Sequence, residues 1–143
     1  MNRMETKLAA RKQRLCVIIP VHNEADNLVA LVRGLETAAG QLHRWNMEIL
    51  FVDDGSSDAS VQQMERIRAC GTPVGFIRLS RNFGHQAALC AGLENVHGDA
   101  IITMDSDLQH PPDEIPKLLE RLGPDFRREN STVADRNAAI NPL

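Results

Sequence analysis

Four short apolar segments alternate with four helix-length segments between residues 15 and 122, and this alternation is the feature that most restricts the fold. The apolar segments are hydrophobic almost throughout, which is typical of strands covered on both faces. They occupy residues 15–19, 47–52, 74–79 and 100–104. The sequence therefore predicts an α/β domain with a mainly parallel sheet and helices on both faces of that sheet.

The segments between the strands have helical periodicity. After the first strand, apolar residues recur at helical spacing at Leu28, Leu31, Val32 and Leu35. Three further helices are predicted over residues 59–69, 86–95 and 111–122. Pro20 is expected to stop the first strand, and Pro111 is suited to the first turn of the last helix.

The patterned part of the chain defines one predicted domain over residues 15–122. Residues 1–14 are expected to be a charged N-terminal extension. Residues 123–143 show neither the apolar pattern of a strand nor that of a helix, and they are expected to form an irregular tail. The extension has no apolar segment of the kind found in secretory signals, and no run of the sequence reaches the length of a transmembrane helix. These observations predict a cytoplasmic protein.

Composition excludes some classes of partner. The formal net charge is −3 and aromatic residues make up only 3% of the chain, which argues against a nucleic-acid surface. The three cysteines have no metal-ligand spacing, and an odd number without a framework fits a reducing compartment. Cys16 in a strand and Cys90 in a helix are both expected to be small core residues.

Polar side chains gather directly after each predicted strand. The clusters are His22-Asn23-Glu24, Asp53-Asp54, Arg81-Asn82 and Asp105-Ser106-Asp107. Because the carboxyl ends of parallel strands meet at one edge of the sheet, where α/β proteins bind ligands, we expect one site built from all four clusters. Asn23 and Asp58 also have a simpler interpretation, since both residue types begin helices.

The last of these clusters has the chemistry of a metal site. Asp105 and Asp107 lie one residue apart where a strand ends, and a turn can bring both carboxylates onto one Mg²⁺ or Mn²⁺. Gln109 is a candidate third oxygen ligand. The alternative is that these aspartates only cap the following helix, because turns favour aspartate.

Several nucleotide and metal motifs are absent from the sequence. There is no Gly-x-Gly-x-x-Gly and no phosphate loop ending in Gly-Lys-Ser/Thr. A calcium loop would need a glycine shortly after Asp107, and Leu108, Gln109 and His110 follow instead. A metal-dependent phosphatase remains an alternative, although such enzymes usually carry the aspartate pair after the first strand rather than the fourth.

Four motifs together resemble family 2 glycosyltransferases, over residues 15–122. They are Pro20-Val21-His22-Asn23-Glu24, Val52 to Asp58, Arg81 to His85, and Asp105 to Pro112. Within that family the chain is most similar to the polyprenyl-phosphate glycosyltransferases, the group of dolichol-phosphate mannose synthase. Many members have tyrosine where this chain has His22.

The resemblance implies a fold and a set of site residues. The fold would be the N-terminal, nucleotide-binding part of a GT-A domain, the nucleotide-diphospho-sugar transferase type. Asp105 and Asp107 would be catalytic and, with Gln109, would hold the divalent metal. The nucleotide sugar would be bound by Pro20, His22, Glu24, Val52, Asp53, Asp54, Arg81, Gly84 and Ser106.

The resemblance also implies substrates and a location. The donor would be a nucleotide-diphosphate sugar and the acceptor an undecaprenyl or dolichyl phosphate, at the cytoplasmic face of a membrane and with a possible membrane-protein partner. Transfer would proceed by direct displacement with inversion. Relatives continue well beyond the metal motif, so this chain is expected to hold the donor site without the acceptor site. A non-catalytic nucleotide-sugar-binding module or remnant is the second interpretation.

Overall fold

The computed structural model describes residues 11–122, and the predicted tail over 123–143 lies outside these residues. The elements occur in the predicted order. They are β1 (Gln13–Val21), α2 (Ala25–Gly40), β2 (Trp45–Asp53), α3 (Ser60–Ala69), β3 (Val74–Arg78), α4 (His85–Glu94), β4 (Ala100–Thr103) and α5 (Glu114–Leu122). The first strand begins within the segment predicted as an extension, because Gln13 and Arg14 already pair with β2.

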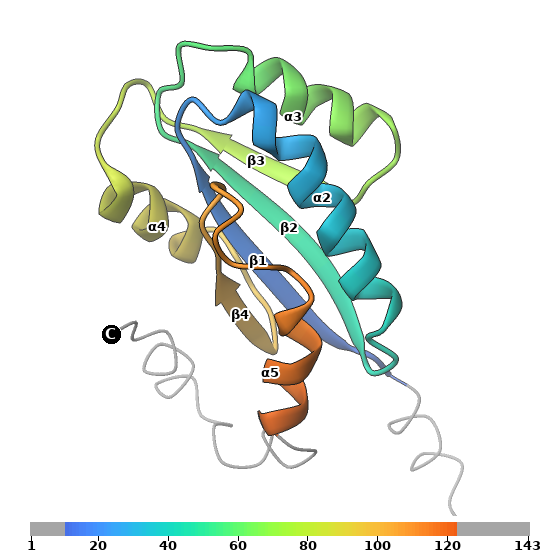
Figure 1. The fold of residues 1–143 in the computed structure, drawn as a ribbon. Helices are drawn as coiled ribbons and strands as arrows, with labels where there is room; N and C mark the ends of the chain where they lie inside the picture. Colours follow the sequence, from blue (N-terminus) through green and yellow to red (C-terminus); the bar gives the residue numbers. More distant parts are fainter. Residues whose placement is uncertain (1–10, 123–143) are drawn as a thin grey trace, which may run out of the picture.

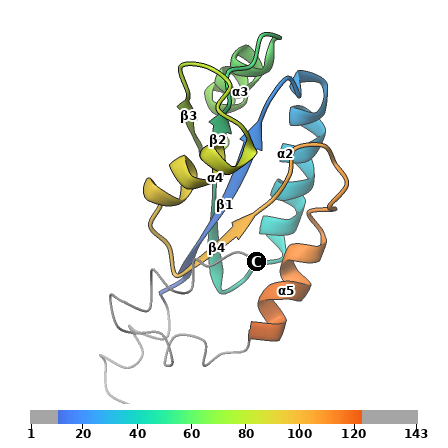
Figure 2. The same cartoon turned by 90° about the vertical axis from the view of Figure 1, so that its left-hand side faces the viewer.

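The strands form one parallel sheet in the order β3-β2-β1-β4. Apolar residues of α2, α3 and α5 pack on one face in the larger core cluster. Helix α4 packs on the opposite face in a smaller cluster, and Figure 2 shows it on the other side of the sheet from α2 and α5. The predicted parallel sheet with helices on both faces is therefore confirmed.

The central strand explains why the sequence reads as continuously apolar. Leu15, Val17 and Ile19 of β1 point into the larger cluster, and Cys16 and Ile18 point into the smaller one. All five side chains are buried. Since successive side chains of a strand face opposite sides, a strand covered on both faces needs an apolar residue at every position.

The sequence predicted that Pro20 would stop β1. This prediction is wrong, because the strand continues to Val21. Pro20 pairs in register with Val52 of β2, while the pairing with β4 ends at Ile18 and Thr103. The carbonyl of Ile18 accepts a hydrogen bond from Met104 on the β4 side. In a strand, the backbone groups of residues 18 and 20 point to the same side, here the side of β4. Proline has no N–H to donate, and β4 no longer pairs with β1 at this position, so no sheet hydrogen bond is lost.

Two further expectations about local structure are corrected. The last helix begins at Glu114 rather than at Pro111, since Pro111 and Pro112 lie before it and their carbonyls accept turn hydrogen bonds from Glu114 and Ile115. Cys90 is exposed rather than a core residue. Helix α4 buries Ala88 and Gly92, four residues apart, and a residue midway between them points to the opposite side of a helix.

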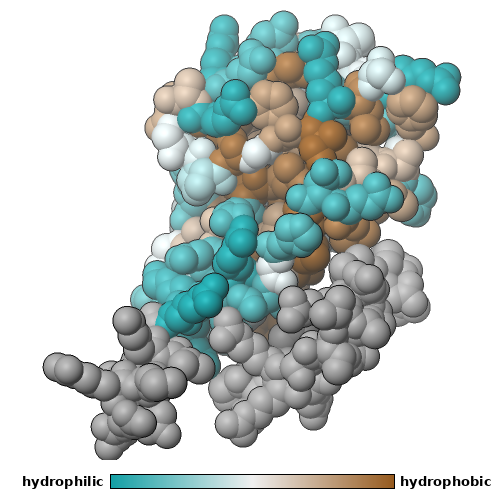
Figure 3. All heavy atoms as spheres, turned by 180° about the vertical axis from the view of Figure 1, so that it is seen from behind, coloured by the Kyte–Doolittle hydropathy of each residue, from teal (hydrophilic) through white to brown (hydrophobic). Residues whose placement is uncertain are grey.

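Helix α4 lies unusually close to the sheet. A Cβ atom added to Gly92 would come within 2.6 Å of the Ile18 Cγ2 atom and 3.2 Å of the Val52 Cγ2 atom, so only glycine fits at this contact. Figure 3, which views the molecule from behind, shows a patch of apolar side chains on this face. Within the described residues, no helix is both long and apolar enough to cross a membrane.

Candidate functional site

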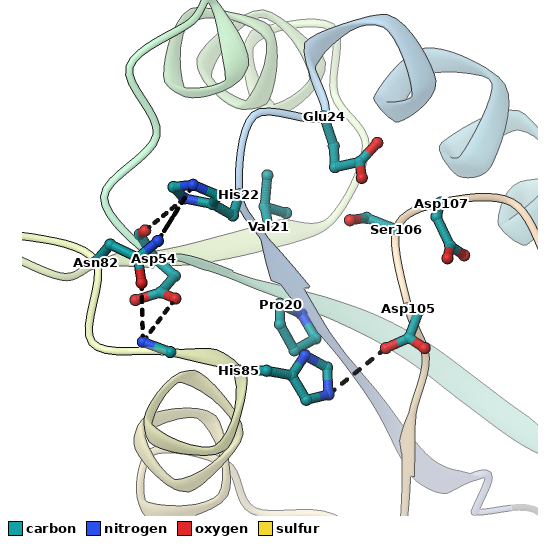
Figure 4. Close-up of a pocket in the computed structure, with 11 residues that line it drawn as sticks. Pro20, Val21, His22, Glu24, Asp54, Asn82, His85, Asp105, Ser106 and Asp107 are labelled. Atoms are coloured by element: carbon teal, nitrogen blue, oxygen red, sulfur yellow. Dashed lines mark hydrogen bonds and ion pairs between the residues drawn. The ribbon is translucent and has the colours of Figure 1, made fainter.

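An open pocket of about 540 Å³ lies at the carboxyl edge of the sheet. The loops after β1, β2, β3 and β4 all contribute to it, so the four polar clusters lie together (Figure 4). Its walls are formed by Pro20, Val21, His22, Glu24, Asp54, Asn82, Gly84, His85, Asp105, Ser106 and Asp107. Three of these, Val21, Asn82 and His85, were not among the predicted binding residues, although all three belong to the recognised motifs.

Three of the predicted nucleotide-sugar-binding residues do not line the pocket. Val52 is fully buried and packs toward α4. Asp53 is also fully buried, and its carboxylate accepts a hydrogen bond from the Ser56 backbone N–H at 3.3 Å. The guanidinium of Arg81 lies over the Phe83 ring, 4.5 Å from its centre. These contacts give the three residues structural roles at the back of the site.

Asp54 lines the pocket but its carboxylate is engaged with the protein. One carboxylate oxygen accepts the Phe83 N–H at 2.7 Å, and the other accepts the Gly84 N–H at 3.0 Å. The side chain is only 4% exposed. Asp54 therefore ties the loop before α4 to the end of β2, and the position of Gly84 in the pocket depends on it.

Gly55 brings the same two loops into direct backbone contact. Its φ is +67°, in the left-handed region that side chains disfavour. A Cβ atom there would lie 2.4 Å from both the carbonyl carbon of Arg81 and the nitrogen of Asn82. The loop after β2 can pack against the loop after β3 only because this residue has no side chain.

The loops after β1 and β2 are joined by a second set of hydrogen bonds, around Asn23. Its side-chain oxygen accepts the backbone N–H groups of Ser57 at 2.7 Å and Asp58 at 3.2 Å. Its own backbone N–H donates to the Ser56 hydroxyl at 2.9 Å. Asn23 has a φ of 53°, a conformation that asparagine tolerates better than most residues.

Asp58 caps two helices at once. One carboxylate oxygen accepts the N–H of Ser60 at the start of α3, at 2.9 Å, and the other accepts the N–H of Ala25 at the start of α2, at 3.2 Å. The pKa of Asp58 is lowered from 3.8: burial acts to raise it, and hydrogen bonds from the Ser60 side chain and from backbone N–H groups outweigh burial. The carboxylate is thus better stabilised in the folded protein than in the unfolded chain.

This lowered pKa predicts a contribution of Asp58 to acid stability. Because the folded-state pKa lies below the unfolded value, the contribution is complete above about pH 4 and is lost as the pH falls through the lowered pKa. Asp58→Asn should therefore flatten the fall in thermal midpoint between about pH 6 and about pH 2.5. Glu65→Gln, on the exposed part of α3, should keep the wild-type slope. Parallel slopes for wild type and Asp58→Asn would contradict the role of Asp58.

The Asp105-Ser106-Asp107 segment leaves β4 and forms the remaining wall of the pocket. Ser106 is buried, Asp105 is about half exposed and Asp107 is exposed. The next residue, Leu108, has a φ of 65°, which is rare for leucine and costs conformational energy. The N–H of Gln109 donates to the Asp107 carboxylate at 3.1 Å, and this short-range bond closes the turn.

The described part of the pocket offers few protein ligands to a divalent cation. Within residues 11–122, no cluster of three or more His, Cys, Asp or Glu side chains is placed to hold a metal ion. Gln109 lies outside the pocket lining, so of the three predicted metal ligands only Asp105 and Asp107 line the pocket. Mg²⁺ and similar ions commonly take one or two protein carboxylates and complete their shell with substrate phosphates. The residues therefore fit a cation that is bound together with a phosphate ligand.

His85 faces Asp105 across the pocket (Figure 4). The His85 Nε2 atom lies 3.6 Å from a carboxylate oxygen of Asp105, and both side chains are about half exposed. His85 is the first residue of α4, and Gly84 before it has a φ of +99°. The beginning of α4 and the aspartate segment therefore form opposite walls of one pocket.

Comparison with solved structures defines the class of fold. The mannosyltransferase PcManGT from Pyrobaculum calidifontis, in complex with GDP-Man and Mn²⁺, superimposes with a TM-score of 0.68 at 20% identity, over 78% of this chain and 33% of that chain. Glucosyl-3-phosphoglycerate synthase from Mycobacterium tuberculosis superimposes with a TM-score of 0.59 at 23% identity, over 83% of this chain and 42% of that chain. The fold is that of GT-A glycosyltransferases, of which this chain covers a part.

Comparison of sequences identifies the family. Residues 16–127 match glycosyl transferase family 2, and the chain belongs to this family. It is 47% identical over 110 residues to the undecaprenyl-phosphate 4-deoxy-4-formamido-L-arabinose transferase of Klebsiella pneumoniae (strain 342), covering 76% of this chain and 33% of that protein. The protein of the same name from Pseudomonas fluorescens (strain Pf0-1) is 48% identical over 104 residues, covering 72% and 30%. The chain thus spans about a third of the length of these relatives.

Proposed function

We propose that this chain is the donor-binding part of a glycosyltransferase that moves a sugar from a nucleotide diphosphate to a polyprenyl phosphate of the undecaprenyl type. The observation that carries the proposal is the convergence of four strand-end clusters on one pocket that contains Asp105 and Asp107. The names of relatives at 47% and 48% identity support the acceptor class.

Within this proposal the pocket binds the nucleotide sugar. Pro20, His22 and Glu24 lie on the wall formed by the first loop, and Gly84 and Ser106 lie on the walls formed by the third and fourth loops. The pocket has both apolar and polar lining residues, and the carboxylates of Asp105 and Asp107 lie at one side of it. We assign Val52, Asp53 and Arg81 to supporting roles behind this wall.

Asp105 and Asp107 would hold Mg²⁺ or Mn²⁺ against the diphosphate of the donor. When bound, the cation stabilises the negative charge that develops on the diphosphate as the bond to the sugar breaks. The carboxylates would hold the cation, and the bound cation would keep the diphosphate in place so that the anomeric carbon is oriented toward the acceptor. Two structural neighbours described with Mn²⁺ are consistent with this assignment.

The acceptor needs little proton chemistry from this part of the protein. A phosphate monoester has its second pKa near about 6, so it is largely ionised at neutral pH and is itself a nucleophile. We place the reaction at the cytoplasmic face of the membrane, where a polyprenyl phosphate would be presented, with a membrane protein as a possible partner. Its product would serve construction of the cell envelope, and the transfer would invert the anomeric centre.

The first test measures donor binding by residues 1–143. Calorimetric titration with UDP, GDP, CDP and ADP should reveal one preferred nucleotide, with binding that depends on Mn²⁺ and is abolished by a chelator. Phosphate release from small phosphate esters that no nucleotide inhibits would instead support the metal-dependent phosphatase. Absence of nucleotide binding with and without Mn²⁺ would contradict the proposal.

The second test separates an enzyme from a binding module. The isolated chain is expected to bind a donor but to transfer little or no sugar, because it spans only a third of its relatives. Residues 15–122 fused to the remaining two thirds of the Klebsiella relative should transfer sugar to undecaprenyl phosphate. A chimera that folds and binds nucleotide but transfers nothing would favour the non-catalytic module.

A further inference from the structure

The ring of His22 joins three loops of the pocket. Its Nδ1 atom lies 2.8 Å from the backbone carbonyl oxygen of Asp54. A carbonyl oxygen can only accept a hydrogen bond, so Nδ1 must carry the hydrogen. In the neutral ring the other nitrogen, Nε2, is then an acceptor, because the bond made by one nitrogen sets the state of the other.

Two amide groups face this acceptor. The side-chain nitrogen of Asn82 lies 3.2 Å from Nε2, and that of Asn23 lies 3.4 Å from it. The Asn82 nitrogen is also 3.4 Å from Nδ1, but Nδ1 is already a donor to Asp54. Only Nε2 is left to accept from the amides.

The orientation of both amides is set by backbone groups that cannot turn around. The oxygen of Asn23 accepts N–H groups from Ser57 and Asp58, and the oxygen of Asn82 accepts the N–H of Gly84 at 3.0 Å. Exchanging oxygen and nitrogen in either amide would place an NH₂ group against a backbone N–H. Each asparagine therefore presents its NH₂ group to His22.

These bonds close into a ring that includes the Asp54 carboxylate (Figure 4). The N–H of Gly84 lies 3.0 Å from Asp54 Oδ2 and 3.0 Å from Asn82 Oδ1. The cycle runs from His22 to Asp54, to Gly84, to Asn82 and back to His22. Breaking one member leaves the loop after β3 attached at fewer points.

We propose that Asn82 is a positioning residue of the pocket that holds His22 in the tautomer with hydrogen on Nδ1 and none on Nε2. Both ring nitrogens are then occupied by the protein. His22 contributes the face of its ring to a bound ligand and neither gives nor takes a proton there. Applied to a nucleotide sugar, which rests on the proposed function, this makes His22 a packing surface for the donor.

The tautomer is tested without any nucleotide. Two-dimensional ¹⁵N–¹H spectra of the histidine rings, with His22→Gln to assign the signal, should show Nδ1 protonated and Nε2 unprotonated at neutral pH. Asn82→Asp keeps an oxygen for the Gly84 N–H but turns a second oxygen toward Nε2, so His22 should become protonated on both nitrogens. Glu24 and Asp54 are the other carboxylates of that side of the pocket, and the Asp54 carboxylate is engaged with Phe83 and Gly84.

Asn46→Asp is the matched control, because it adds the same charge at an exposed position near the other end of β2. It should leave the His22 signals unchanged. A wild-type His22 with hydrogen on Nε2, or an Asn82→Asp variant that folds and retains the wild-type pattern, would overturn the proposal. If Asn82→Asp does not fold, the wild-type spectrum alone still tests whether the hydrogen is on Nδ1 or on Nε2.

Nucleotide titration adds a separate readout. Asn82→Ala removes the bonds to His22 and Gly84 and should weaken binding of the preferred nucleotide diphosphate about three- to tenfold, the equivalent of one hydrogen bond. Asn46→Ala should have no effect. Unchanged affinity in Asn82→Ala would remove its positioning role, whereas absence of nucleotide binding by wild type, with the expected tautomer, would contradict the proposed function alone.

Discussion

Replacing Asp107 by asparagine is expected to weaken Mn²⁺-dependent binding of nucleotide diphosphates about a hundredfold or more. Mutations of groups that only support metal ligands cost about 10- to 100-fold in affinity, and a ligand itself should cost at least the upper value. Asparagine keeps the oxygen that accepts the Gln109 N–H, so the turn after β4 should be preserved. The measured quantity is calorimetric affinity with saturating Mn²⁺, beside circular dichroism of the variant.

Asp113→Asn is the matched control for this prediction. It makes the same change of charge six residues later, at an exposed position outside the pocket. It should bind like wild type. If the two variants are equally weak, or if wild-type affinity is the same with Mn²⁺ and with chelator, the metal role of Asp107 is wrong.

Replacing Gly55 by alanine is expected to destabilise the protein by about 3 kcal/mol and to disrupt nucleotide binding. The left-handed conformation costs a side chain about 1–2 kcal/mol, and overpacking in a tight contact adds about 1–3 kcal/mol. The clash is with backbone atoms of Arg81 and Asn82, which cannot rotate away as a side chain can. The Asp54 carboxylate accepts hydrogen bonds from the next two residues of that loop, Phe83 and Gly84, so the loop cannot move away from Gly55 without straining or losing those bonds.

Gly71→Ala separates the two causes. Gly71 also has a positive φ, +95°, but an added Cβ would meet nothing within 4 Å. It should therefore show the conformational cost alone, about 1–2 kcal/mol in urea unfolding, with nucleotide binding intact. Equal losses of stability in the two variants would show that the contact between the loops contributes nothing.

The sequence alone was sufficient to predict the layout of this domain. Strands buried on both faces need an apolar residue at every position, as β1 shows, and that requirement is visible without coordinates. The apolar patterns also predicted the order of strands and helices along the chain. A parallel sheet with that order brings the four polar clusters together at one edge. Asp105, Asp107 and Glu24 were predicted there because any residue placed just after a parallel strand must lie at that edge.

Which way each side chain points was decided only by the tertiary structure. Val52 and Asp54 are two residues apart in one motif, yet Val52 packs under α4 and Asp54 turns its carboxylate to the loop after β3. Arg81 lies over Phe83, outside the pocket lining, and Asn82 beside it lines the pocket. Sequence motifs place residues near a site, but the hydrogen-bonding partners come from segments about 30 residues away in the chain.

Pro20 and Cys90 illustrate the same limit in the scaffold. Proline is compatible with β1 only because β4 has ended by that point, and the lengths of neighbouring strands cannot be read from the residue itself. Cys90 is exposed because α4 turns Ala88 and Gly92 to the sheet. The close contact at Gly92, which leaves no room for a side chain, determines which face of the helix is buried. Local sequence thus determined the elements and the edge where they meet, whereas packing between distant segments determined the partners of each side chain, because burial and hydrogen bonding are satisfied only in three dimensions.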